Sequence, residues 1–214
     1  MTLPLKQPYE PMEAKSVEKL PVGDNWQYEP KWDGFRCIAF RDGDKVELQS
    51  KSGQPLARYF PELVDALVKV KPKQFVVDSE IVVPVKGKFS FDDLLMRIHP
   101  AASRIKKLSQ ETPAKMIVFD FLVDDRGKSL VDLTLKERRK KLDAFAKKYF
   151  SKNKSIELSP CTDDLKIAKD WLAGAGVDLD GVIALATGLQ GRFSQSYGNY
   201  AYMAGHVEIG RAHV

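Results

Sequence analysis

EPKWDGFR, residues 29–36, places a lysine directly before a glycine turn and an arginine five residues after that lysine. A lysine amine is a nucleophile only when it is neutral, and its reference pKa of about 10.4 leaves it almost fully protonated near pH 7. Burial or a cationic neighbour lowers that pKa, and Arg36 or a bound metal ion could act in this way on Lys31. Taken alone, the hexapeptide fits a surface lysine in a β-turn equally well.

The segments that follow strengthen the catalytic interpretation, because they resemble, in order, the motifs of the covalent nucleotidyltransferases. This group comprises ATP-dependent DNA ligases, RNA ligases and mRNA capping enzymes. The matching segments are SKSG (50–53), YFPEL (59–63), DSEI (78–81), FSFDDLLMRIH (89–99), VFDF (118–121), LTLKERRKKL (133–142) and DGVIA (180–184). The segments at 89–99 and 133–142 favour DNA ligases, and the likeness is strongest to small bacterial repair ligases that work with end-joining systems.

The resemblance implies an ATP-dependent DNA ligase in which Lys31 attacks ATP to form lysyl-AMP. AMP then passes to the 5′-phosphate of a nick in double-stranded DNA, and the 3′-hydroxyl seals the nick. Mg²⁺ is the implied metal, because carboxylates and phosphates supply the oxygen ligands that it prefers. The implied site residues are Glu29 beside the adenine, Arg36 and Glu80 at the ribose, Phe119 stacked on the adenine, Glu80 and Asp180 at the metal, and Lys51 at a DNA phosphate.

Several of these residues have a plainer alternative, and three depart from the family pattern. Glu80 could lie on a solvated strand face, Phe119 in the core, and Lys51 in a solvated turn. Lys51 stands where arginine is usual, so it would contact phosphate as a point charge without a bidentate fork. Ser79 replaces a glycine. Asp180 replaces a glutamate that is one methylene longer, so its contact with a metal could pass through water.

Hydrophobic periodicity, capping residues and turn signals predict an α+β fold. Asp42-Gly43-Asp44 predicts a hairpin, and the spacing of Asp78 and Glu80 places both carboxylates on one side of a strand. The resemblance implies an ATP-grasp-like nucleotidyltransferase fold of antiparallel sheets flanked by helices. The predicted strands are 26–31, 36–41, 45–50, 75–83, 116–123 and 181–184, and the predicted helices are 61–70, 90–97, 134–150 and 163–175.

The predicted organisation is an N-terminal arm over residues 1–25, an adenylation domain over 26–184, and a divergent or artefactual tail over 185–214. Leu185 stands where the family has a lysine, and no lysine follows Lys169. The last seven residues, EIGRAHV, can be back-translated into the start of a sequencing adapter. We therefore expect a copy that is incomplete at its C-terminal end and lacks the oligonucleotide-binding-fold domain. Such a copy would bind ATP yet adenylate poorly.

Composition places further bounds on function. The 214 residues carry a net charge of +5, which suits a polyanionic partner such as nucleic acid. No run of 18 apolar residues occurs, so no membrane span is expected. Cys37 and Cys161 are predicted to be free thiols in a reducing cytoplasm, with Cys37 in the core. We expect a bacterial, nucleoid-associated monomer.

Two other functions remain open from the sequence. One is an RNA ligase or a capping-type nucleotidyltransferase, and the choice between ATP and GTP would separate it from a DNA ligase. The other is a catalytically impaired fragment that binds nucleotide, DNA or a protein partner. The missing lysines after residue 169 favour this second alternative, and a covalent AMP adduct on Lys31 would exclude it.

Overall fold

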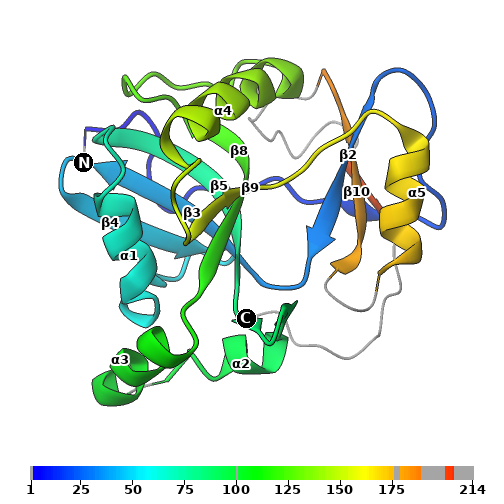
Figure 1. Ribbon diagram of the computed structural model, residues 1–214. Helices are drawn as coiled ribbons and strands as arrows, with labels where there is room; N and C mark the ends of the chain where they lie inside the picture. The colour runs from blue at the N-terminus through cyan, green and yellow to red at the C-terminus, as the bar shows by residue number, and fades with distance from the viewer. Residues whose placement is uncertain (1, 100, 176–178, 189–200, 205–214) are drawn as a thin grey trace.

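The computed structural model describes residues 2–99, 101–175, 179–188 and 201–204, the last four by their backbone alone. Helices flank two larger β-sheets and a two-stranded hairpin (Figure 1). This arrangement confirms the predicted α+β fold. Most strand pairs are antiparallel, so the prediction of antiparallel sheets is corrected for two pairs only. The parallel pairs are β1 (Lys15–Ser16) with β11 (Ala201–Ala204) and β8 (Lys115–Val123) with β9 (Ile156–Leu158).

The five-stranded sheet has the order β4-β3-β5-β8-β9. The predicted hairpin forms its edge, and Gly43 takes the positive φ of 67° that this tight turn requires. The parallel pair β8–β9 arises because α4 crosses between these two strands. The strands are β3 (Phe35–Asp42), β4 (Lys45–Ser50), β5 (Gln74–Val82), β8 (Lys115–Val123) and β9 (Ile156–Leu158).

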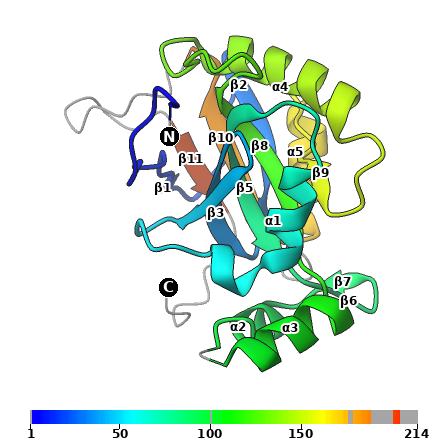
Figure 2. The same cartoon turned by 90° about the vertical axis from the view of Figure 1, so that its left-hand side faces the viewer.

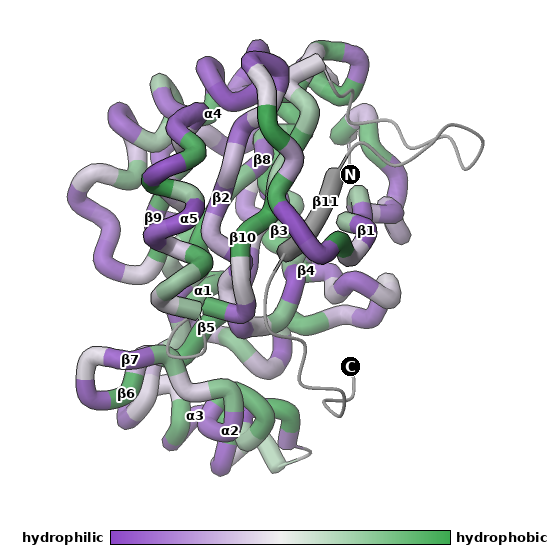
Figure 3. Tube along the Cα trace, turned by 90° about the vertical axis from the view of Figure 1, so that its right-hand side faces the viewer, coloured by the Kyte–Doolittle hydropathy of each residue, from purple (hydrophilic) through white to green (hydrophobic). Residues whose placement is uncertain are grey.

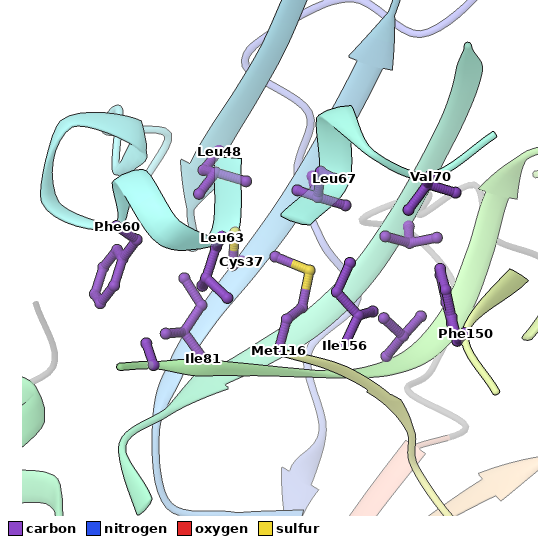
Figure 4. Packing of buried hydrophobic residues seen from close by; sticks show 14 of the residues in the cluster. Cys37, Leu48, Phe60, Leu63, Leu67, Val70, Ile81, Met116, Phe150 and Ile156 are labelled. Carbon is purple, nitrogen blue, oxygen red and sulfur yellow. The ribbon is translucent and has the colours of Figure 1, made fainter. Parts of the chain in front are cut away.

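The main hydrophobic core lies between this sheet and its helices (Figure 4). Helix α1 (Pro61–Val68) begins with proline at its first turn and buries Leu63 and Leu67. These leucines lie in the same cluster as Ile81 and Met116 from the sheet. Cys37 is also in this cluster and is fully buried, and both cysteines are free, as predicted.

The four-stranded sheet has the order β1-β11-β10-β2. At one edge of this sheet, β2 (Trp26–Trp32) pairs with β10 (Leu179–Ala186) in antiparallel register, with Lys31 opposite Gly181 and Glu29 opposite Ile183. One face packs on α5 (Leu165–Ala173) through a small buried cluster that includes Tyr28, Val182 and Ala168. On the other side of β10 lies β11 (Ala201–Ala204), within the predicted tail, and then β1 (Lys15–Ser16), within the predicted arm, at the opposite edge.

Helix α4 (Leu135–Tyr149) is the longest helix in the described part of the chain, and it confirms the prediction from Thr134 and Glu137. Thr134 caps the helix, and the two side chains form a capping box, which satisfies backbone groups that a helix start leaves free. The helix is mostly hydrophilic along its length (Figure 3). It nevertheless buries Arg138 and Arg139 beside its apolar residues.

A small lobe projects at one end of the five-stranded sheet, where α2, α3 and the β6–β7 hairpin lie together (Figure 2). Ser90 caps α2 (Phe91–Leu95), as predicted from the spacing of Ser90 and Asp93. Helix α3 (Ala102–Glu111) was not predicted, because its two buried side chains, Ile105 and Leu108, are the only periodic signal. The hairpin strands are β6 (Pro84–Val85) and β7 (Lys88–Phe89).

The other predicted elements are present, with ends shifted by a few residues. Helix α1 stops at Val68 rather than near residue 70, and β10 extends the predicted strand at both ends. Residues 189–200 and 205–214, on which much of the tail prediction rests, lie outside the described residues. Within the described ranges, no helix is both long and apolar enough to cross a membrane.

Candidate active site

Strand β2 carries the candidate nucleophile at its end, where the chain passes directly into β3 of the other sheet. Side chains two residues apart on a strand share a face, so Glu29 and Lys31 point to the same side of β2. Tyr28 points to the opposite side, into the cluster under α5. The candidate site therefore lies on the face of β2 that turns away from α5.

Lys31 is a partly exposed side chain whose ammonium group is paired with Asp180. Its Nζ donates a hydrogen bond to Oδ2 of Asp180, and the two side chains retain 25% and 40% of their exposure. This contact joins β2 to the start of β10. It places the candidate nucleophile and one candidate metal ligand in direct contact.

Arg36 lies at the start of β3 and is held by Asp78 of β5 through two hydrogen bonds of 2.7 Å, from Nε and Nη2. A bidentate pair of this kind fixes both the position and the plane of the guanidinium. The guanidinium carbon lies 4.6 Å from the centre of the Phe119 ring, in a cation–π arrangement. Phe119 is half-buried and belongs to β8, so three strands bring these groups together.

Glu80 faces the same region from β5, directly opposite Arg36 in the strand register. Burial raises the pKa of Glu80 to about 8, Arg36 and Lys31 oppose that rise, and Asp78 and Asp180 add to it. Glu80 is thus close enough to all four groups to feel their charges. It does not lie on a solvated face, and a cation bound nearby would favour its ionised form.

Glu29 is a buried carboxylate that is held from two sides. Gln27 Nε2 donates a hydrogen bond of 2.7 Å to Oε1, and Arg139 Nη1 lies 3.5 Å from the same oxygen. Burial raises the pKa of Glu29 to about 7, while Arg139 and Gln27 lower it. Arg36 and Asp120 also act on this carboxylate, which places Glu29 within electrostatic range of the Arg36–Phe119 pair.

The sequence did not predict a role for three buried residues behind the site, which are Asp120, Arg138 and Arg139. Arg138 forms two hydrogen bonds of 2.8 Å with Asp120, and both side chains are almost fully buried. Arg139 also donates to the carbonyl oxygen of Ser159 at 2.6 Å. The paired arginines of the 133–142 segment and the aspartate of VFDF were the available signals. They showed that these residues are part of a pattern but not which carboxylate each arginine meets.

Lys51, predicted to contact DNA, lies apart from Lys31 in the turn after β4. Its ammonium is 3.0 Å from a carboxylate oxygen of Glu13, and both side chains are largely exposed. The neighbouring arm residue Met12 accepts a hydrogen bond of 3.4 Å from Arg36 through its carbonyl oxygen. The N-terminal arm therefore passes between Lys51 and Arg36.

The carboxylates near Lys31 could hold a metal ion only if oxygen atoms of a bound substrate and of water completed its coordination shell. Asp180 contributes to the raised pKa of Glu80, and the two carboxylates approach from different strands. The described residues contain no group of three or more acidic, histidine or cysteine side chains suited to hold a metal. Two carboxylates, with phosphate and water oxygens completing the shell, suit Mg²⁺, which usually binds in this way.

Gly34 is required at the turn between β2 and β3. A Cβ atom there would lie 2.4 Å from the carbonyl oxygen of Ile81 and 2.8 Å from Cγ of Glu80. We expect Gly34→Ala to lower the free energy of unfolding by about 1–3 kcal/mol and to displace Glu80. Urea denaturation measures this effect. Gly188→Ala is the control, because no atom lies within 4 Å of its added Cβ; equal stability of the two variants would contradict the prediction.

Comparison with known proteins places this geometry in a family. The family model described as ATP dependent DNA ligase domain matches residues 11–193. DNA ligase C2 of Mycolicibacterium smegmatis is 44% identical over 189 residues, which are 86% of this chain and 51% of that protein. DNA ligase C of Mycobacterium tuberculosis is 44% identical over 188 residues, with the same coverage. The chain thus spans about half the length of these curated relatives.

Solved structures share the fold. The ligase domain of M. tuberculosis LigD superposes with a TM-score of 0.70 at 24% identity, covering 92% of this chain and 60% of that one. A mycobacterial DNA ligase D complexed with ATP and MES gives a TM-score of 0.64 at 21% identity, with the same coverage. On the strength of the family match, which covers most of its residues, the chain belongs to the ATP-dependent DNA ligase domain family.

Proposed function

We propose that this chain is the adenylation unit of an ATP-dependent DNA ligase, with Lys31 as the residue that becomes bonded to AMP. The observation that carries the proposal is the grouping of Lys31, Asp180 and Glu80 beside Arg36, at the point where β2 passes into β3. This grouping joins a nucleophile to acidic and basic groups suited to a metal-bound triphosphate. The relatives' name supports DNA as the final acceptor.

In the first step, the Lys31 amine attacks the α-phosphorus of ATP. A bond forms between Nζ and phosphorus, the bond from phosphorus to the bridging oxygen breaks, and pyrophosphate leaves with the electron pair. The amine must first lose a proton, and Asp180 is the acceptor in contact with it. Negative charge moves through the transition state, so the positions of these groups carry most of the rate enhancement.

The other predicted site residues bind the nucleotide. The ring of Phe119, beneath the Arg36 guanidinium, provides a surface on which a base can stack. Glu29 faces the base, and Arg36 and Glu80 face the ribose. Glu80 and Asp180 would hold Mg²⁺, which neutralises phosphate charge when bound.

In the later steps, AMP moves to the 5′-phosphate of a nick, and the 3′-hydroxyl displaces it to form the phosphodiester bond. Lys51 provides a cation for a DNA phosphate once the exposed pair with Glu13 opens, which costs little because such pairs are weak. We infer a monomeric protein of the bacterial cytoplasm that associates with the nucleoid. The resemblance of its motifs to those of small bacterial repair ligases supports a role in end-joining repair.

A second candidate is a nucleotide-binding unit that does not catalyse adenylation. Leu185 favours it, because this residue lies opposite Gln27 and therefore on the same face of the sheet as Glu29. An apolar side chain stands there in place of the lysine that the family resemblance leads us to expect. This replacement removes a cation that would otherwise help to hold a phosphate.

Incubation with labelled ATP and Mg²⁺ tests the proposal. We expect label from α-labelled ATP, but not from γ-labelled ATP, to remain on the denatured chain and to be released by acid, as a bond between lysine and phosphorus would be. GTP should give little label. Absence of label from a folded chain that still binds ATP would reject the proposal in favour of the second candidate. Preference for GTP would indicate a capping-type enzyme.

A further inference from the structure

The two carboxylate oxygens of Glu29 differ in their hydrogen bonds. This difference is the basis of an inference that rests on the proposed function. Both protein donors, Gln27 Nε2 and Arg139 Nη1, reach Oε1 of Glu29. The other oxygen, Oε2, has no hydrogen-bond partner among the residues that the structure describes. Oε2 is not among the fully enclosed polar atoms that lack a partner in the described residues, which belong to Arg41, Arg97 and Ser129, so it is open to a donor from a ligand.

The two donors come from different parts of the molecule, so the carboxylate is fixed rather than free to rotate. Gln27 is its neighbour on the same face of β2, with 8% of its surface exposed. Arg139 reaches it from α4, and its own guanidinium is anchored by Asp143 at 2.8 Å and by the Ser159 carbonyl oxygen at 2.6 Å. A planar guanidinium that two other groups anchor has a fixed orientation, and it helps in turn to fix the orientation of Glu29.

We propose that Gln27 and Arg139 are positioning residues that set the base specificity of the site, by holding Glu29 so that Oε2 accepts a hydrogen bond from the exocyclic amine of adenine. A base with a carbonyl oxygen at the same position presents an acceptor to an acceptor and is rejected. Neither residue touches the nucleotide. Arg139 and Gln27 also favour the ionised form of Glu29, which is the form that accepts from an amine most strongly.

Binding of ATP and of inosine triphosphate tests this proposal, because the two nucleotides differ at that position of the base. Binding is measured by calorimetry with metal removed by EDTA, so that no covalent step occurs. We expect the wild-type chain to bind ATP about 10–100-fold more tightly than inosine triphosphate. We expect Gln27→Leu and Arg139→Met each to reduce this ratio at least about five-fold, mainly through weaker ATP binding.

Two further variants distinguish an effect on the orientation of Glu29 from a general loss of structure. Lys140→Ala removes an exposed cation next to Arg139 on α4 and none of the contacts that hold Glu29, so the ratio should stay near the wild-type value. Arg139→Lys keeps the charge without the fork and should restore only part of the ratio. If Arg139→Met does not fold, Gln27→Leu still decides, because it removes only the donor on β2.

The outcomes distinguish this proposal from the proposed function. A wild-type chain that becomes labelled by ATP but binds both nucleotides equally would uphold the ligase chemistry and overturn this inference. If the chain selects ATP through Gln27 and Arg139 but never becomes labelled, the inference holds and the proposed ligase chemistry is rejected. Equal weakening of both nucleotides in Gln27→Leu and Arg139→Met would also overturn it, because loss of structure alone affects the two alike.

Discussion

Lys31→Ala is expected to abolish covalent labelling of the chain by α-labelled ATP, with the rate of adenylation lowered by at least about 10³-fold. No other described lysine is in contact with Asp180, so no neighbouring amine is placed to take over the attack. The fold should survive, because the ion pair that is lost is partly exposed, and such pairs contribute at most about 1 kcal/mol. Single-turnover labelling followed by denaturing electrophoresis measures the effect.

Two controls separate nucleophilicity from charge and from general surface change. Lys31→Arg keeps a cation beside Asp180, but a guanidinium does not deprotonate in proteins, so labelling should be lost as completely. Lys45→Ala removes another exposed lysine that pairs with a carboxylate on a strand, Glu47, and labelling should be unchanged. Residual labelling of Lys31→Ala at more than a few per cent of the wild-type rate would place the adduct on a different residue.

The elements predicted most accurately from the sequence are those whose signals are local. The Asp42-Gly43-Asp44 turn defined the β3–β4 hairpin, and Thr134 with Glu137 defined the start of α4. The spacing of Asp78 and Glu80 placed both carboxylates on one side of β5. In the first two cases a few adjacent residues determine hydrogen bonds that form within the same segment, and in the third the alternation of side chains along a strand is sufficient.

The pairings inside the site were not predictable in this way. Glu80 is the residue directly opposite Arg36 in the register, yet the guanidinium binds Asp78. Which of two nearby carboxylates accepts depends on the twist of the sheet and on the Phe119 ring beneath Arg36. The spacing of residues in the sequence gives neither the twist of the sheet nor the position of the Phe119 ring.

The buried arginines of α4 show the same limit more strongly. Arginine is rarely buried unless paired, so in a segment rich in lysine and arginine a solvated face is the usual expectation. The partner of Arg138 is Asp120, 18 residues earlier, and that of Arg139 is Glu29, 110 residues earlier. The packing of α4 against β8 brings Arg138 to Asp120, and the side chain of Arg139 reaches Glu29 on β2. The short strands β9 and β11 likewise pair with strands that are distant in the sequence.

Arg138→Met is expected to destabilise the fold by about 3–5 kcal/mol, because it leaves the charge of Asp120 buried without its partner. That is a large part of the 5–15 kcal/mol that holds a typical domain together. Methionine keeps the apolar stem, so little of the loss comes from packing. Urea denaturation at neutral pH measures the change, with Lys115→Met as the control. Its pair with Glu157 is partly exposed, and we expect a loss below about 1 kcal/mol.

The double variant Arg138→Met/Asp120→Leu separates the value of the pair from the cost of an unpaired charge. If the single variants are unstable mainly because one charge stays buried, removing both should cost less than the sum of the two. We expect the double variant to recover at least about 1 kcal/mol relative to that sum. Strict additivity would mean that Asp120 and Arg138 act separately, Asp120 through the backbone N–H of Phe121 and Arg138 through the Leu133 carbonyl oxygen. Because Asp120 follows Phe119 on β8, the double variant should also weaken ATP binding even where stability recovers.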